Sequence, residues 1–330
     1  MRYTKQSIHK DVKKKNMIKI LRTILEITFC LTAIIMIIIV AFFPKEYKKP
    51  DKTKWGQNNG FIALSYTGVS QNNNEKLISQ SQLNSHLKTL YDFGYVTIDI
   101  QDIVNYYKYG GLLPDKALFL MFEDGRIDSS LFAQPVLEKY NFKAVMFTYA
   151  SNVEGGDRLF LKKGDLDYLD NNSYWEIGSN GYRFSYINVY KKISEGSGDN
   201  DSNLDMRYTH YLMDYLRDED DIPLESKKQM QQRITWDYDE MNRIYTDVLG
   251  YQPEVYMIMR ANTLLNNMNL AVEEINLKNI YKYFKLMFNR EELCYNSKDD
   301  SIYNLTRMQV QPDWAADRLL AEIEENVRER

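Results

Sequence analysis

The repeated alternation of short apolar segments with amphipathic ones, from residue 59 onward, limits the possible folds more than any other feature of this chain. Residues 117–122 (ALFLMF) and 143–149 are almost continuously apolar, which is typical of strands buried on both faces. Residues 129–140 and 225–248 have helical spacing, and the second segment ends before Gly250, a favoured residue at a helix end. Repeated strand–helix units predict an α/β fold with a parallel sheet or barrel.

The first 54 residues differ from the rest in charge and hydropathy. They contain 13 Lys or Arg and four Asp or Glu, whereas residues 55–330 contain 29 basic and 42 acidic residues. Residues 24–43 are almost entirely apolar, and about 20 apolar residues of helix are enough to cross a bilayer. We therefore expect four parts: a basic cytoplasmic tail (1–23), a transmembrane anchor (24–43), a polar tether (44–58) and one large domain (59–330).

The charges that flank the apolar segment predict its orientation. Basic residues exceed acidic ones more strongly before residues 24–43 than after them, so the N-terminus should be cytoplasmic and the large domain extracytoplasmic. The segment has no small-residue cleavage site at its end, which favours an uncleaved single-pass anchor in the lipid bilayer of the cell membrane. The acidic body argues against a nucleic-acid partner. It would tolerate a cationic, partly deacetylated amino-sugar polymer, although solubility explains the charge equally well.

Three predicted strand ends carry the candidate functional residues, because functional groups of parallel α/β folds gather at the carboxyl ends of strands. Glu123 and Asp124 follow the apolar strand 117–122 directly. Asn180 and Tyr182 follow a predicted strand at 175–177, and Arg260 follows another at 255–259. Paired carboxylates at such an edge are typical of general acid–base chemistry.

Taken in order, these segments resemble the polysaccharide deacetylase family, the NodB-type homology domain of carbohydrate esterase family 4. Residues 121–125 (MFEDG) are similar to the first catalytic motif, Thr-Phe-Asp-Asp-Gly. Residues 176–180 (EIGSN) are similar to the start of the second, and residues 249–253 (LGYQP) with Arg260 to the third. Residues 61–66 and 305–308 look like the opening and closing strands. The resemblance implies a distorted (β/α) barrel and a hydrolase of the amide bond in acetylated sugars.

The resemblance also assigns roles to residues. In that family one Asp acts as general base, the next Asp and two His bind a divalent metal such as zinc, and an Arg orients the base. Carried over, Glu123 is the base, Asp124 the metal ligand and Arg260 the orienting residue. However, Asn180 and Phe184 stand at the positions of the two metal His. Asp124 alone does not provide the three protein ligands that a catalytic zinc ordinarily needs.

Two functions therefore remain open. The chain is either an atypical deacetylase of an N-acetylated cell-surface or exopolysaccharide glycan, or a non-catalytic glycan-binding or scaffold protein of a membrane polysaccharide-synthesis complex. A glycoside hydrolase that uses Glu123 and a second carboxylate is a weaker third hypothesis.

Three residues are candidates for substrate binding. Asn180 belongs to the second motif, and Tyr182, which flanks this motif, offers an aromatic face to a sugar ring. His210 lies four residues before Asp214, a spacing that would place both on one helical face. His86, in contrast, has the sequence context of a structural residue on a helix.

Overall fold

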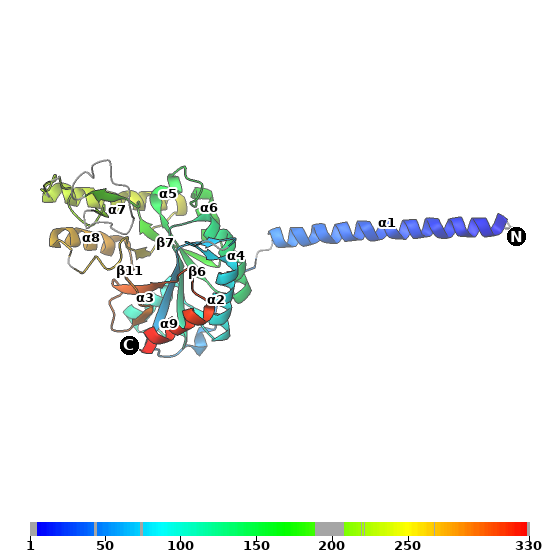
Figure 1. Ribbon diagram of the computed structural model, residues 1–330, viewed down its shortest axis with the longest axis horizontal. Helices are drawn as coiled ribbons and strands as arrows, with labels where there is room; N and C mark the ends of the chain where they lie inside the picture. The colour runs from blue at the N-terminus through cyan, green and yellow to red at the C-terminus, as the bar shows by residue number, and fades with distance from the viewer. Residues whose placement is uncertain are drawn as a thin grey trace. The chain divides into compact units, whose positions relative to one another are not determined.

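The computed structural model describes residues 5–42, 45–72, 75–188, 208–218, 220, 222–266 and 268–328 (Figure 1). The chain divides into two compact units, Met1–Glu46 and Tyr47–Arg330. The first contains the helix α1 (Lys5–Phe42). Within the described ranges, no helix combines the length and the hydropathy that a membrane span requires.

In the described part of the second unit, seven parallel strands close into a barrel. Each strand pairs with two neighbours in the ring order β1-β5-β6-β7-β10-β11-β13, and the pairing of β1 with both β5 and β13 closes the ring. The expected (β/α) barrel is therefore confirmed. The strands are β1 (Gly60–Tyr66), β5 (Ala117–Phe122), β6 (Ala144–Tyr149), β7 (Trp175–Gly181), β10 (Val255–Met257), β11 (Leu286–Glu291) and β13 (Leu305–Gln309).

Short strands extend the barrel. β4 (Val96–Thr97) adds in parallel to β5, and β12 (Tyr295–Ser297) adds antiparallel to β1. Two small ribbons lie outside it: β2 (Val69–Ser70) pairs with β3 (Ile78–Ser79), and β8 (Tyr186–Asn188) pairs with β9 (Tyr208–His210).

The helices begin and end where the sequence provides caps. The side chain of Ser226 forms a capping box with Gln229 at the start of α7, and Gly250 ends that helix in the left-handed conformation, with φ +80°. The helices of this unit are η1 (Lys52–Lys54), α2 (Gln80–Asp92), α3 (Ile100–Tyr109), α4 (Ile127–Tyr140), α5 (Ala150–Glu154), α6 (Lys163–Asp170), α7 (Lys227–Leu249), α8 (Leu270–Tyr283) and α9 (Ala316–Arg328).

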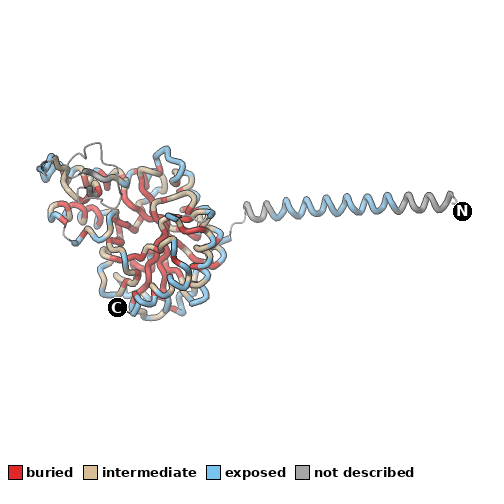
Figure 2. Tube along the Cα trace, in the orientation of Figure 1, coloured by how far each residue is buried: buried red, intermediate tan, exposed pale blue. Residues whose placement is uncertain are grey.

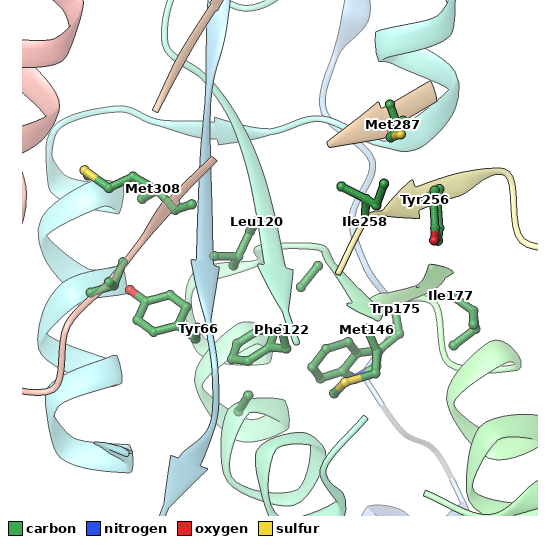
Figure 3. Packing of buried hydrophobic residues seen from close by; sticks show 14 of the residues in the cluster. Tyr66, Leu120, Phe122, Met146, Trp175, Ile177, Tyr256, Ile258, Met287 and Met308 are labelled. Atoms are coloured by element: carbon green, nitrogen blue, oxygen red, sulfur yellow. The ribbon is translucent and has the colours of Figure 1, made fainter. Parts of the chain in front are cut away.

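Alternate residues of the strands supply two hydrophobic layers, because successive side chains of a strand point to opposite faces. One layer fills the barrel, where the rings of Phe119 and Phe288 stack 5.4 Å apart. The other packs between the strands and the surrounding helices. Figure 3 shows Tyr66, Phe122 and Trp175 in that outer layer. The ring centre of Phe122 lies 5.6 Å from that of Tyr66 and 5.3 Å from that of Trp175. Figure 2 shows the resulting buried interior of the unit.

From Tyr47 onward, the stretch predicted as a tether is part of the folded unit. The backbone N–H of Tyr47 donates to Ser173 Oγ at 2.8 Å. Lys48 exchanges two hydrogen bonds with Asn141, and Trp55 is buried in the layer that fills the barrel. The polar composition of residues 44–58 concealed these contacts because they are made mainly by the backbone and by Trp55.

Candidate functional site

The inward-facing positions of the strands change from apolar to polar at the carboxyl end of the barrel. Ala63, Met121 and Leu305 belong to the layer that fills the barrel. The next inward positions, two residues further along each chain segment, are polar and buried. They are Ser65 on β1, Glu123 directly after β5, and Arg307 on β13. The period of two that fills the barrel with apolar side chains therefore brings three polar ones to its mouth.

Glu123 and Arg307 form a two-pronged ion pair at this mouth. Arg307 Nε donates to Glu123 Oε1 at 2.8 Å, and Nη2 donates to Oε2 at 3.3 Å. Nη2 also lies 3.3 Å from an oxygen of Glu291, on β11. Such a planar, paired contact fixes the orientation of the carboxylate.

The arginine that contacts Glu123 is thus Arg307, and not the residue that the sequence analysis assigned to that role. Arg260 is exposed and adopts a left-handed backbone conformation, with φ +58°. Arg307 belongs to residues 305–308, which the sequence analysis treated only as a closing strand. Its signal was the single charged residue of this short strand, at an inward position.

Asp124 follows Glu123 in a turn that only certain residues allow. Its φ is +66°, and Gly125 has φ +63°. A Cβ atom on Gly125 would lie 2.7 Å from Thr148 Cγ2, so this position has no room for a side chain. Burial, and to a lesser extent the charge of Glu123, raise the pKa of Asp124 to about 6, although Arg126 and Arg307 oppose the shift. Asp124 therefore exchanges its proton close to neutral pH.

Asn180 lies beside Asp124. Its Oδ1 accepts a hydrogen bond from the backbone N–H of Asp124 at 3.4 Å, which links the end of β7 to the turn after β5. The side-chain oxygen of Asn180 therefore stabilises the turn that carries Asp124.

Aromatic side chains follow Asn180 along the chain. The ring of Phe184 is 54% exposed and lies 6.0 Å from the ring of Tyr149, the last residue of β6. Tyr182 is partly buried and packs edge-on against Trp236 of α7, at 5.6 Å. The rim of the mouth is thus partly aromatic.

His210 is not placed as the sequence spacing suggested. It lies in β9, not in a helix shared with Asp214. Its Nδ1 accepts from the N–H of Leu212 at 3.3 Å, and its Nε2 donates to the carbonyl oxygen of Arg183 at 3.1 Å. Burial lowers the pKa of His210 to about 4, so the ring is neutral at pH 7. Since both ring nitrogens bind the backbone, His210 joins the segment after β7 to the segment after β9.

His86 is a structural residue of α2, as expected. It is buried, with Nδ1 lying 3.3 Å from the Tyr66 hydroxyl and Nε2 lying 2.9 Å from the carbonyl oxygen of Trp314.

Comparisons with known proteins show which solved structures share this barrel. No family profile matches the chain. A 90-residue segment is 28% identical to the candidate polysaccharide deacetylase YxkH of Bacillus subtilis (strain 168), and this match spans 27% of the present chain and 32% of the relative, about a third of its length.

Solved structures match much more of the chain. The de-N-acetylase of Aggregatibacter actinomycetemcomitans superposes with a TM-score of 0.62 at 16% identity, over 79% of this chain and 98% of that one. IcaB from Ammonifex degensii gives 0.57 at 17% identity, over 81% and 98%. The Streptococcus pyogenes deacetylase PplD gives 0.56 at 15% identity, over 80% and 98%. The chain has the polysaccharide deacetylase fold.

Within this deacetylase fold, the donor atoms at the mouth do not suit the zinc that the resemblance implies. Both oxygens of Glu123 accept from Arg307, Asn180 directs its oxygen to a backbone N–H, and Phe184 has no lone pair. In the part of the chain that the structure describes, no three His, Cys, Asp or Glu side chains are grouped as a metal site. The described side chains at the mouth therefore do not supply the ligand set of a catalytic zinc.

Proposed function

We propose that this protein uses its deacetylase fold to bind an N-acetylated cell-surface or exopolysaccharide glycan at the barrel mouth, without metal-dependent hydrolysis. The observation that carries the proposal is the ring of Phe184. It stands at the position that corresponds by resemblance to a metal His, it is 54% exposed, and it lies beside Tyr149. An exposed flat ring can pack against the apolar face of a pyranose but cannot bind a metal.

The polar groups at the mouth complement this ring. Asp124 follows Glu123 in the chain and is partly exposed, and its backbone N–H donates to Asn180 Oδ1. Ligand sites typically combine apolar, aromatic walls with a few convergent polar groups. Asp124 and Phe184 together meet that description, with Asp124 available to a sugar hydroxyl or amide.

An atypical hydrolase is the second candidate, and one observation favours it. The pKa of Asp124 is about 6, because burial and the neighbouring Glu123 disfavour its charged form. A carboxyl group that titrates near neutral pH is suited to general acid–base catalysis. The products distinguish the reactions, since a deacetylase releases acetate and a glycosidase releases shorter sugars.

We propose in addition that residues 24–43 attach the protein to the cell membrane, with the N-terminus cytoplasmic and the domain outside. The excess of basic residues before this segment supports the orientation. Large apolar side chains from Met17 to Met36 are exposed along α1, and a bilayer would cover them. Proteins of a membrane polysaccharide-synthesis complex are the partners that this location favours.

Membrane attachment is tested by fractionation. The full chain should stay in the membrane pellet after alkaline carbonate extraction, and protease added outside intact cells should degrade the domain. Release of the chain into the alkaline supernatant would contradict the proposal.

The glycan proposal is tested by calorimetric titration of the full chain with N-acetylglucosamine oligomers. We expect saturable binding, at least tenfold weaker in Phe184→Ala, which corresponds to about 1.4 kcal/mol. Tyr109→Ala is the matched control, because Tyr109 is an exposed aromatic residue of α3 at 78% exposure. Equal weakening by both variants, or acetate release that requires zinc and Asp124, would contradict the proposal.

A further inference from the structure

Next to the mouth, three aromatic rings surround the guanidinium group of Arg183. Its central carbon lies 4.3 Å from the ring centre of Tyr211, 5.3 Å from that of Tyr182 and 6.0 Å from that of Trp236. Asp237, the next residue of α7, places Oδ2 3.4 Å from Arg183 Nε. We call these three rings and the Asp237 carboxylate the aromatic cage. Rings that surround a cation beside a carboxylate are the arrangement by which proteins recognise ammonium groups.

A second arginine packs on the same Tyr211 ring and shows what a fixed, structural contact looks like here. Arg233 lies 4.6 Å from the ring centre. Its guanidinium binds both oxygens of Glu225 and the carbonyl oxygens of Tyr211 and Asp214. Arg183 has no comparable set of partners among the described residues, and its buried Nε donates no hydrogen bond there. Arg183 is therefore held mainly by the charge of Asp237 and by the rings.

Asp237 explains why a cation is held in the aromatic cage. It is 2% exposed, and within the described ranges its Oδ2 accepts no hydrogen bond. Burial raises the pKa of Asp237 to about 7, although Arg183 and Arg233 lower it in part. A buried carboxylate without a cationic partner is costly, and Arg183, 3.4 Å away, is that partner in this structure, so a cation that displaces Arg183 must take over this contact.

The aromatic cage can be reached from solvent. The Arg183 side chain is 35% exposed and Trp236 is 50% exposed. The cage also adjoins the mouth, because Tyr182 follows Asn180 by two residues and its carbonyl oxygen accepts from the N–H of Ser151, just after β6.

We infer that the aromatic cage binds the protonated primary amine of a de-N-acetylated amino sugar, and that Arg183 is an internal occupant which this amine displaces. The inference rests on the proposed function, because it names the sugar residue that a partly deacetylated glycan would place next to the mouth. The net charge of −13 on residues 55–330 favours such a cationic polymer. Since the amine must displace Arg183, the wild-type protein binds it more weakly than an emptied cage would.

The test is calorimetric titration of the full chain with a fully de-N-acetylated glucosamine tetramer. We expect Arg183→Ala to bind the tetramer at least fivefold more tightly than the wild type, and Asp237→Asn to bind it at least tenfold more weakly. Arg243→Ala is the matched control, because Arg243 is a half-exposed arginine of α7 that pairs with surface carboxylates, and this variant should leave the affinity unchanged. Equal or weaker binding by Arg183→Ala would overturn the inference, as would unchanged affinity in Asp237→Asn.

Two measurements keep this test decisive. If circular dichroism shows that Arg183→Ala is unfolded, Arg183→Gln takes its place with the same expected gain. Re-acetylation of the tetramer removes its amines, so the cage should no longer contribute to binding. Wild type and Asp237→Asn should then bind the re-acetylated tetramer with equal affinity. If Phe184→Ala binds acetylated oligomers as tightly as the wild type, the proposed function is contradicted. The response to the Arg183 and Asp237 substitutions tests the cage alone.

Discussion

Replacement of Arg307 by Met tests whether the buried ion pair at the barrel mouth is formed as described. The substitution keeps much of the side-chain volume but leaves the carboxylate of Glu123 buried without its partner. Both groups are buried, and their two contacts are 2.8 and 3.3 Å long. Removing one partner of such a pair typically costs about 3–5 kcal/mol. We expect Arg307→Met to lower the free energy of unfolding by that amount at pH 7.

The double variant Glu123→Leu/Arg307→Met separates the ion pair from simple packing. An apolar replacement of both partners is often neutral, so the double variant should recover at least about 2 kcal/mol of the loss in the single variant. The assay is urea unfolding followed by tryptophan fluorescence, with equal m-values required for the comparison. Arg158→Met is the control, and it should change stability by less than about 0.5 kcal/mol because Arg158 is exposed.

Two results would refute this reasoning. A loss below about 1 kcal/mol in Arg307→Met would mean that Glu123 is not buried beside it. A double variant no more stable than the single one would mean that the two residues do not interact.

Three further predictions concern the turn, the aromatic cage and the metal. Gly125→Ala should destabilise the protein by about 2–3 kcal/mol more than Gly94→Ala in thermal denaturation, since both glycines have positive φ but only Gly125 faces Thr148, and equal losses would contradict the steric argument. The pKa of Asp237 rises from 3.8 to about 7 on folding, so its contribution to stability is largest at low pH and decreases as pH rises through 7. Asp237→Asn removes this decrease, so the variant should gain stability relative to wild type between pH 4 and 8, by up to about 4 kcal/mol, and parallel pH profiles would contradict it. Zinc at tenfold molar excess should leave the melting temperature unchanged, because a metal bound to the folded state alone would raise it.

Much of the fold could be predicted from local sequence. The continuously apolar strand at 117–122 and the capped helix that ends at Gly250 both depend on neighbouring residues, and both are observed. The order of the motif-like segments indicated the barrel. Glu123, Asp124 and Asn180 could be predicted to meet, because strand ends of a parallel barrel share one edge, and Asn180 does contact the backbone of Asp124.

The remaining features depend on contacts between distant segments. Arg307 reaches Glu123 only because β13 and β5 both pair with β1, and no local pattern carries that information. His210 and Asp214 have helical spacing, yet this stretch pairs with β8 and turns, so tertiary pairing overrides the local pattern. The aromatic cage joins residues that follow β7 to residues of α7, about 50 positions apart in the chain, and sequence spacing does not reveal it.

Saturation-transfer NMR of the full chain with an N-acetylglucosamine oligomer and added zinc tests the central claim most directly, because one series of spectra reports both binding and hydrolysis. Our account predicts saturation of the acetamide methyl and ring protons, reduced in Phe184→Ala, with no free-acetate signal during prolonged incubation. Growth of the acetate signal in the wild type, and its absence in Asp124→Ala, would contradict the account and establish an active hydrolase.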